Sequence, residues 1–256
     1  MKVRLIDTKY NDPYMNMAID EALLTSKEPV LRFYGWKPAG LSIGYFQFKN
    51  SFNFNNIKKH NIKLVRRLTG GNAVLHDKEL TYSFIIDEDK MPKSIIDSYK
   101  EISKGLLQGL KNLNLNPEMN QEVKKGEKSA VCFNDPSWYE ILVNKRKLVG
   151  SAQKRINKKL LQHGAILIEV DIDKYCSLFC NYSKELVNKL NQRMTSINQE
   201  LKKEITYDEL KKAMIKGFET ELSLNFTEDT LTKKEQELAQ KLYMEKYSTD
   251  NWNLKW

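Results

Sequence analysis

The order of apolar patterns along the chain limits its fold most strongly. Short apolar runs, bounded by Gly, Pro, Asn and Asp, alternate with helical patterns up to residue 171, and helical spacing prevails after residue 172. We therefore expect an α+β fold, in which a mixed β-sheet core is flanked by helices and followed by a helical C-terminal part. Residues 1–200 are expected to form the main domain, and residues 201–256 a helical extension packed on it.

The expected strands are short and rich in β-branched and aromatic residues. They span residues 3–6, 30–34, 41–46, 62–67, 73–75, 80–86, 140–143, 147–149 and 164–171. The three residues Asn144, Lys145 and Arg146 separate two of these runs, which predicts a hairpin with a three-residue turn.

Helical patterns lie between and after these strands. They cover residues 14–25, 95–113, about 182–202, 206–222 and 229–248. The first follows Asn11-Asp12-Pro13, which is typical of a helix start. The polar stretch 114–128 contains Pro117 and Gly126 and is expected to be a loop or a short edge strand.

Charge and cysteine content narrow the function classes. The formal net charge of +9 favours an acidic partner: nucleic acid, an anionic membrane or an acidic protein. The lysines are spread along the chain, and no apolar stretch reaches the length of a membrane span. Three cysteines predict no disulfide framework, and the N-terminus MKVRLIDTKY lacks the apolar run of a signal peptide, so we expect a cytoplasmic protein.

Two of the cysteines, Cys176 and Cys180, are four residues apart and are expected to share one buried helix face. Without a nearby His or further Cys they make a poor metal site, so no metal is expected.

The segment from Arg66 to Asp77 is the first candidate for a functional site. Its paired glycines, Gly70 and Gly71, let a backbone pass close to a ligand, and Arg66 and Arg67 precede them as possible anion partners. The same letters also fit a tight hairpin with surface arginines.

Cys132 is the candidate nucleophile. It follows a polar, charged stretch and precedes the turn sequence Asn134-Asp135-Pro136-Ser137. A cysteine at such a junction can be accessible, which thiolate chemistry requires, although a lone cysteine is more commonly a small buried side chain.

A third candidate segment runs from Lys147 to Gln153. A lysine at the start of an apolar strand ordinarily points to solvent, but the small residues Gly150, Ser151 and Ala152 that follow leave room for an acyl chain against the backbone. His163, next to Gly164, fits either a structural or a functional histidine.

Together these segments resemble the biotin/lipoate protein ligase and octanoyltransferase superfamily. The resemblance covers about residues 1–200, beginning with Met15–Leu24 and continuing through 31–36, 41–47, 66–77, 147–152 and 163–164. Within it, the phrase from Cys132 to Glu140 and the run His76–Ser83 look like those of the LipM-type octanoyltransferases.

The resemblance implies a catalytic domain over residues 1–200 and a thioester mechanism without cofactor. Cys132 would carry the acyl group and Lys147 would stand beside it, favouring the thiolate by charge attraction. The residues implied to bind substrate are Arg67, Gly70, Gly71, His76, Gly150, Ser151, Ala152 and His163.

The implied donor is octanoyl-acyl carrier protein. The implied acceptors are lysines of lipoyl domains, such as those of the glycine cleavage H protein and E2 subunits, with no nucleic-acid or membrane partner. Three alternatives remain: an ATP-dependent lipoate–protein ligase, an amidotransferase between lipoyl domains, and a non-catalytic binding module.

Overall fold

The computed structural model describes residues 1–120 and 140–255, so Cys132 and its segment lie outside the described residues. The strands are β1 (Lys2–Asn11), β2 (Val30–Trp36), β3 (Gly40–Ile43), β4 (Lys63–Arg66), β5 (Val74–His76), β6 (Glu79–Asp87), β7 (Pro117–Met119), β8 (Ile141–Val143), β9 (Arg146–Ile156), β10 (Lys159–Leu167) and β11 (Asn225–Asp229). The α-helices are α1 (Pro13–Ala22), α2 (Phe54–Lys59), α3 (Ile95–Lys111), α4 (Ile172–Ser177), α5 (Lys184–Arg193), α6 (Ile197–Leu201), α7 (Tyr207–Leu222), α8 (Lys233–Leu242) and α9 (Asp250–Asn253). Short helical turns lie at Leu23–Thr25, Lys49–Ser51, Glu88–Lys90 and Tyr243–Tyr247.

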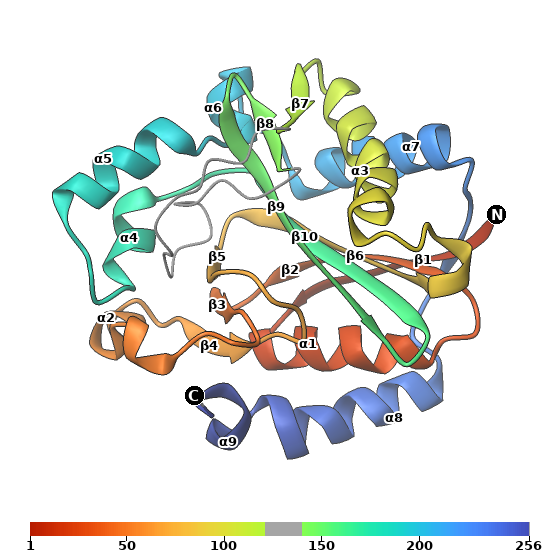
Figure 1. Ribbon diagram of the computed structural model, residues 1–256, viewed down its shortest axis with the longest axis horizontal. Helices are drawn as coiled ribbons and strands as arrows, with labels where there is room; N and C mark the ends of the chain where they lie inside the picture. Colours follow the sequence, from red (N-terminus) through yellow and green to blue (C-terminus); the bar gives the residue numbers. More distant parts are fainter. Residues whose placement is uncertain (121–139, 256) are drawn as a thin grey trace.

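Two sheets form the framework. Within the described residues, the larger sheet has eight strands in the order β11-β1-β2-β6-β10-β9-β8-β7, and the smaller has the order β4-β3-β5. The first three strands of the larger sheet are parallel and the others pair antiparallel, so the sheet is mixed (Figure 1). The expected α+β fold with a mixed sheet core is confirmed.

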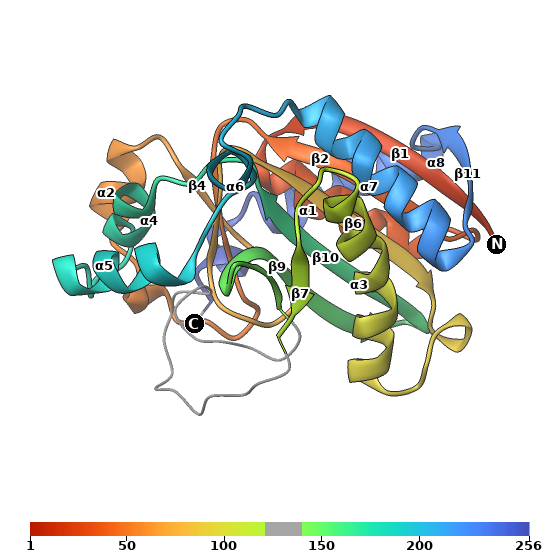
Figure 2. The same cartoon turned by 90° about the horizontal axis from the view of Figure 1, so that it is seen from above.

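Helices cover both faces of the larger sheet. Figure 1 shows α1 and α8 on one side and α3 with α7 on the other, and Figure 2 shows α3 and α7 lying side by side. Phe84 of β6, Leu106 of α3 and Phe218 of α7 belong to one buried cluster, whereas Ile19 of α1 and Leu161 of β10 belong to the cluster on the opposite face. Burying a side chain of this size contributes about 1.5–3 kcal/mol, so alternation along β6 and β10 holds both helix layers in place.

The smaller sheet forms a separate part of the core with α2, α4 and α5, on the left of Figure 1. Its buried residues include Leu41 and Val74, and the same cluster contains Ala165 and Leu167 of β10. The smaller sheet therefore packs against one face of the larger sheet near the end of β10, and the space between the two sheets holds the cavities described below.

Local signals in the sequence explain where the main helices begin. The side chain of Asp12 accepts hydrogen bonds from the backbone N–H groups of Tyr14 and Met15, and Pro13 occupies the first turn of α1. Helix α7 starts with a reciprocal capping box between Thr206 and Glu209. The helices expected at 14–25, 95–113 and 206–222 are thereby confirmed, the first with Leu23–Thr25 as a 3₁₀ turn.

The predicted hairpin is confirmed, but its turn has two residues rather than three. Asn144 and Lys145 both have positive φ, 49° and 61°, as the tight turn of a two-residue hairpin requires, and Arg146 already belongs to β9. The single helix expected at 182–202 is wrong, because Thr195 between α5 and α6 donates its backbone N–H to the carbonyl oxygen of Lys147 (3.0 Å).

Other boundaries also differ. The strand expected at 164–171 lies at Lys159–Leu167, and α4 follows it. Cys176 on α4 is buried as expected, but Cys180 is exposed because the helix has already ended at Ser177.

The last third of the chain is not wholly helical. Strand β11 pairs in parallel with β1 at the edge of the larger sheet. The division at residue 200 remains a prediction. Among the described residues, no helix combines the length and the apolar character needed to cross a membrane.

Candidate active site

A narrow cavity of about 150 Å³ lies between the two sheets, and we call it the inter-sheet cavity. Strands of both sheets, helix α1 and the turn between β4 and β5 contribute to its walls. The lining residues are Met17, Tyr34, Trp36, Ser42, Arg67, Gly71, Asn72, Val74, His76, Thr81, Gly150, Ser151, Ala152, His163, Gly164 and Ala165. A concave, mainly pre-formed site of this kind is typical of small-ligand binding.

Most residues that the sequence singled out for substrate binding line this one cavity. They are Arg67, Gly71 and His76 from the first segment, Gly150, Ser151 and Ala152 from the third, and His163. Gly70 is in the same turn but is not among the lining residues. Segments nearly 100 residues apart thus converge on one space.

The turn between β4 and β5 is held against β3 by close backbone contact. A Cβ placed on Gly44 would lie 1.8 Å from the carbonyl oxygen of Gly71, so only glycine fits there. Gly71 itself has a φ of +86°, and the backbone N–H of Tyr45 donates to the carbonyl oxygen of Thr69 (2.9 Å). The glycines therefore allow one loop to lie directly on the other.

The side chain of Arg67 stabilises this turn by hydrogen bonds to its backbone. Its Nη2 donates to the carbonyl oxygens of Gly70 (2.7 Å) and Asn72 (2.8 Å), and its Nη1 donates to that of Ser42 (2.9 Å). These charge-assisted bonds fix the shape of the cavity wall.

Arg66 does not serve as an anion partner, and that expectation is wrong. Its guanidinium is fully buried and donates to backbone carbonyl oxygens of Gly44, Tyr45 and Gln47, and to those of Trp252 and Asn253 near the C-terminus. Because its donors are directed at carbonyl groups, Arg66 ties α9 to the β3–α2 loop.

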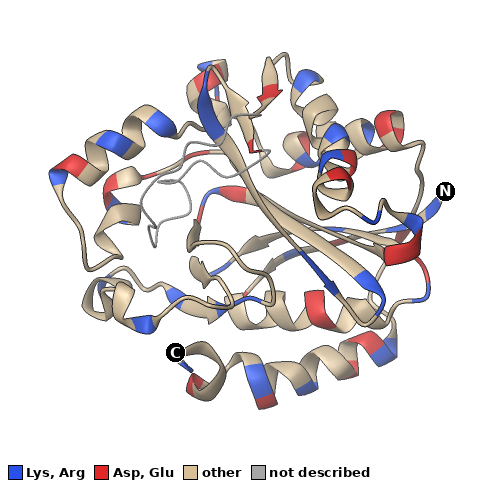
Figure 3. Ribbon diagram, in the orientation of Figure 1, with Lys and Arg blue, Asp and Glu red and all other residues tan. Residues whose placement is uncertain are grey.

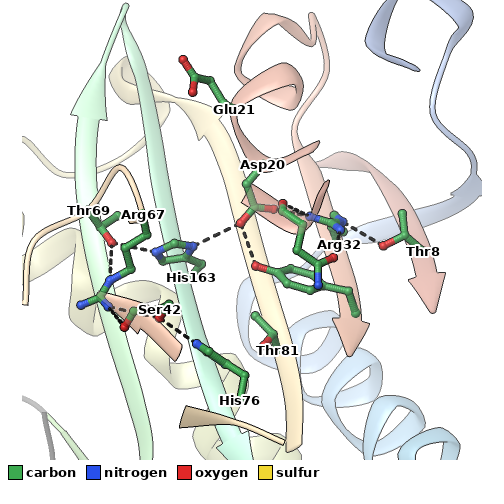
Figure 4. A network of polar contacts seen from close by, with 12 residues as sticks. Thr8, Asp20, Glu21, Arg32, Ser42, Arg67, Thr69, His76, Thr81 and His163 are labelled. Atoms are coloured by element: carbon green, nitrogen blue, oxygen red, sulfur yellow. Dashed lines mark hydrogen bonds and ion pairs between the residues drawn. The ribbon is translucent and has the colours of Figure 1, made fainter. Parts of the chain in front are cut away.

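His163 is held by a polar network that Figure 4 shows in detail. Its Nε2 lies 2.7 Å from Oγ1 of Thr69, and its Nδ1 lies 3.2 Å from Oδ2 of Asp20. Nε of Arg67 donates to Oγ1 of Thr69 (3.1 Å), so the threonine hydroxyl is free to donate to Nε2. Nδ1 faces the ionised carboxylate of Asp20, so this nitrogen carries a proton and donates it to Oδ2.

Asp20 lies at the centre of this network. Burial acts to raise the pKa of its carboxyl, but the attraction of Arg32 and the hydrogen bonds from His163 and Tyr34 prevail and lower it. Arg32 donates to Oδ1 of Asp20 (2.6 Å) and Tyr34 donates to Oδ2 (2.8 Å). Asp20 is therefore an ionised, fully paired support for His163.

His76 has a different environment. Its Nε2 lies 2.8 Å from Oγ of Ser42, and its ring stacks on Trp36 with centroids 4.0 Å apart. Burial lowers the pKa of this imidazole well below its ordinary value, with the positive charge of Arg67 as the next cause. His76 is thus a neutral wall of the cavity.

Lys147, the proposed partner of Cys132, is buried rather than exposed to solvent. It stands near the start of β9, only 4% of its surface is exposed, and its Nζ forms an ion pair with Oε1 of Glu140. Ammonium groups are buried in this way only with a counter-charge. Its relation to Cys132 stays a prediction, because Cys132 lies outside the described residues.

Several residues of this site carried no assigned role in the sequence. Asp20 had a detectable signal, because it lies with Asn16 on the apolar face of a helical pattern. The environments of Ser42, Trp36 and Glu140 arise from contacts between distant segments, which no local pattern indicates.

The fold and the cavity define a ligand-binding domain of mixed α+β type. The family model of the lipoyl protein ligase A/B catalytic domain matches residues 12–219, and the chain belongs to this family.

Curated relatives and solved structures agree with the resemblance seen in the sequence. The chain is 44% identical to octanoyltransferase LipM of Bacillus subtilis, with 98% of each chain covered, and 41% identical to octanoyltransferase LipM of Staphylococcus aureus, with 96% of each covered. A lipoate-protein ligase A bound with ATP has a TM-score of 0.84 at 28% identity, covering 99% of both chains. A second solved structure is that of a bi-partite lipoate protein ligase and its E2 lipoyl domain from Thermoplasma acidophilum. It has a TM-score of 0.83 at 27% identity, and the match covers 99% of this chain and 96% of that one.

Proposed function

We propose that the protein is an octanoyltransferase of lipoate biosynthesis, which moves an octanoyl group from acyl carrier protein to a lysine of a lipoyl domain. The relatives that match nearly the whole chain at 41–44% identity are octanoyltransferases, whereas the ligase structures are 28% identical or less. The ATP-dependent ligase and the amidotransferase are therefore less favoured.

The inter-sheet cavity carries the proposal. Its walls combine small residues at Gly150, Ala152 and Gly164 with the stacked pair of Trp36 and His76, and an unbranched acyl chain suits such a narrow space. The polar groups around it, such as His163 and Arg67, are already bonded to protein atoms. The cavity therefore selects by shape and apolar contact.

The proposed chemistry uses a covalent intermediate. The Cys132 thiolate attacks the carbonyl carbon of the octanoyl thioester, the carrier thiol leaves, and the octanoyl group becomes bound to the enzyme sulfur. The Lys147 ammonium favours the thiolate and donates to the carbonyl oxygen as negative charge develops on it. Glu140 holds that ammonium in place through their buried ion pair. A lysine amine of the acceptor then attacks the enzyme thioester and forms an amide.

The proposed donor is octanoyl-acyl carrier protein, and the proposed acceptors are lipoyl domains such as those of the glycine cleavage H protein and E2 subunits. Acidic carrier domains suit a chain with net charge +9. Figure 3 shows Lys and Arg interspersed with Asp and Glu over α3, α5, α7 and α8, so the excess positive charge is spread over the molecule. We place the reaction in the cytoplasm, in keeping with three cysteines and no expected disulfide.

A donor comparison tests the proposed function. The purified protein is incubated with an apo lipoyl domain and either octanoyl-acyl carrier protein without ATP, or octanoate with ATP and Mg²⁺, and the mass of the lipoyl domain is followed. Modification from the carrier thioester alone is the expected result. Modification that requires ATP and free acid selects the ligase, and transfer only from an octanoylated lipoyl domain selects the amidotransferase.

A further inference from the structure

A second, larger cavity of about 320 Å³ opens beside the inter-sheet cavity, and we call it the charged cleft. It is lined by Leu75, Asp77, Lys78, Glu79, Leu167, Glu169, Val170, Asp171, Lys174, Tyr175 and Met194. Leu167 pairs with Glu79 across β10 and β6, whereas Ala165 and Thr81, two residues further along each strand, line the inter-sheet cavity. Because alternate residues of a strand share one face, the two cavities lie end to end on the same face of the larger sheet.

The charged cleft also adjoins the proposed catalytic lysine. Met194 lines the cleft and forms an isolated parallel bridge with Lys147, whose carbonyl oxygen accepts the N–H of the next residue, Thr195. The cleft therefore lies between the end of the inter-sheet cavity and the start of β9.

Most charged groups in the cleft have partners. Lys78 forms an ion pair with Glu169, and Nζ of Lys174 lies 2.7 Å from Oδ2 of Asp77. The carboxylate of Asp171 accepts the backbone N–H of Lys174 (2.9 Å) at the start of α4.

Glu79 differs from these groups, because only one of its two carboxyl oxygens has a hydrogen-bond partner among the described residues. Its side chain is 1% exposed, and its Oε1 accepts a hydrogen bond from Thr81 (2.6 Å). Its Oε2 has no hydrogen-bond partner among the described residues, and the same holds for Nδ1 of His76, which lies 3.4 Å from Oε1 of Glu79. An enclosed carboxyl oxygen without a hydrogen-bond donor is unfavourable, so we expect a bound group to donate to it.

Burial raises the pKa of the Glu79 carboxyl to about 8, and the polar contacts of Thr81 and Trp36 offset only part of this effect. The other ionisable groups around it are His76 behind it and those that line the cleft with it, namely Asp77, Lys78, Glu169, Asp171, Lys174 and Tyr175. A carboxyl group poised near neutral pH is matched to the work of a general base.

The acceptor needs such a group. A lysine side chain with an ordinary pKa of about 10.4 is an ammonium ion in all but about one in 2,500 molecules at pH 7, and an ammonium ion cannot attack a thioester. The proposed reaction therefore requires a proton acceptor near the place where the lysine enters.

We propose that the charged cleft admits the acceptor lysine and that Glu79 takes the first proton from its ammonium group; this inference rests on the proposed function. The freed amine nitrogen then forms the C–N bond at the thioester carbonyl carbon. The C–S bond breaks with its electron pair on sulfur, and the second amine proton ends on that sulfur as the thiol. Glu79 later releases its proton to solvent through the open cleft.

The test separates the two halves of the reaction. The octanoyl-enzyme is first formed with octanoyl-acyl carrier protein and then mixed with either a lipoyl domain or hydroxylamine, a nucleophile that is uncharged at neutral pH and needs no base. In Glu79→Gln we expect deacylation by the lipoyl domain at pH 7 to slow at least 30-fold and to recover as pH approaches 10. The rates of acylation by the donor and of deacylation by hydroxylamine should stay within about threefold of those of the wild-type protein.

Glu237→Gln is the matched control, because Glu237 is an exposed side chain on α8 and should behave like the unmodified protein. Glu79→Asp shortens the side chain but keeps the carboxylate, so its rate of deacylation by the lipoyl domain should lie between those of Glu79→Gln and the wild-type protein. This variant replaces Glu79→Gln in the test if Glu79→Gln does not fold. Equal slowing with both nucleophiles, or no slowing with the lipoyl domain, would overturn the role of Glu79. If the wild-type protein takes up no octanoyl group from the donor, the proposed function itself is wrong.

Discussion

The inter-sheet cavity and the charged cleft share one face of the larger sheet, yet they treat polar groups differently. In the cavity, His163, Arg67 and Asp20 are each bonded to protein partners and hold the walls rigid. In the cleft, surface ion pairs surround Glu79, one of whose carboxyl oxygens has no partner among the described residues. Polar groups whose hydrogen bonds are all made stabilise the wall of a binding cavity. A buried polar group that lacks a hydrogen-bond partner is available to take part in a reaction. We infer that the first region holds the acyl chain and the second handles the amine.

Filling the inter-sheet cavity gives the largest expected effect. Ala152 lines it opposite His163 of β10, and Ala152→Phe places a ring where the acyl chain is expected. We expect the rate of acylation by octanoyl-acyl carrier protein to fall at least 100-fold, and acylation by an acetyl donor to fall much less, as measured by intact mass spectrometry. An equal loss for both donors would mean that the cavity does not hold the chain.

The turn between β4 and β5 offers a matched pair of glycine substitutions. A Cβ on Gly44 meets the carbonyl oxygen of Gly71, whereas a Cβ on Gly70 meets no atom within 4 Å among the described residues. Gly44→Ala should lower the free energy of unfolding by about 1–3 kcal/mol and slow acylation about tenfold. Gly70→Ala should change the stability little, so a large loss of acylation in that variant would support direct substrate contact at Gly70, and unchanged acylation would remove it from the site.

The pH dependence of stability tests the environment of Glu79. The pKa of its carboxyl is about 8 in the folded protein against an ordinary value of 4.5, so the folded state binds more protons than the unfolded state between these pH values. The contribution of Glu79 to the free energy of unfolding is therefore fully present below about pH 4.5. As the pH rises from there to about 8, the free energy of unfolding falls by up to about 1.4 kcal/mol for each pH unit. Glu79→Gln should remove this fall, so its free energy of unfolding should exceed that of the unmodified protein increasingly from pH 5 to pH 8.

Urea denaturation at several pH values measures this difference. Burial keeps His76 neutral and lowers its pKa well below 6.5, so His76 reduces stability at acid pH in both proteins and cancels in the comparison. Parallel stability curves for the two proteins would show that Glu79 is not desolvated.

The surface pairs of the charged cleft should matter least. Lys78 and Glu169 form an ion pair in which the side chains are 66% and 39% exposed, and solvent screens such pairs. Lys78→Ala should leave the unfolding midpoint unchanged within error and the deacylation rate within about twofold. A tenfold change in deacylation would show that this pair positions the acceptor.

The sequence predicted the cavity better than the cleft. Motif residues 81 positions apart in the sequence, Gly71 and Ala152, line one cavity, because small residues are required wherever two backbones and a ligand meet. Glu79 begins a strand like many surface carboxylates, yet it is buried in the folded chain, with His76 of β5 beside it. Long-range packing of this kind leaves no local pattern.

The same distinction holds for the fold. Periodic segments with capping residues, such as α3 behind Ser94, were predictable because the signal is local. Strand β11 has the sequence Asn-Phe-Thr-Glu-Asp, is mostly exposed and pairs with β1 more than 200 residues away, so its own letters do not predict a strand. The break between α5 and α6 likewise depends on the backbone of Lys147.

The most direct measurement is the intact mass of the protein after incubation with octanoyl-acyl carrier protein, without ATP and without an acceptor. The account predicts one added octanoyl group, located on Cys132 by peptide mapping, absent from Cys132→Ser and released by a lipoyl domain as its lysine becomes octanoylated. A folded protein that gains no mass yet still modifies the lipoyl domain, or a Cys132→Ser variant with full activity, would contradict it.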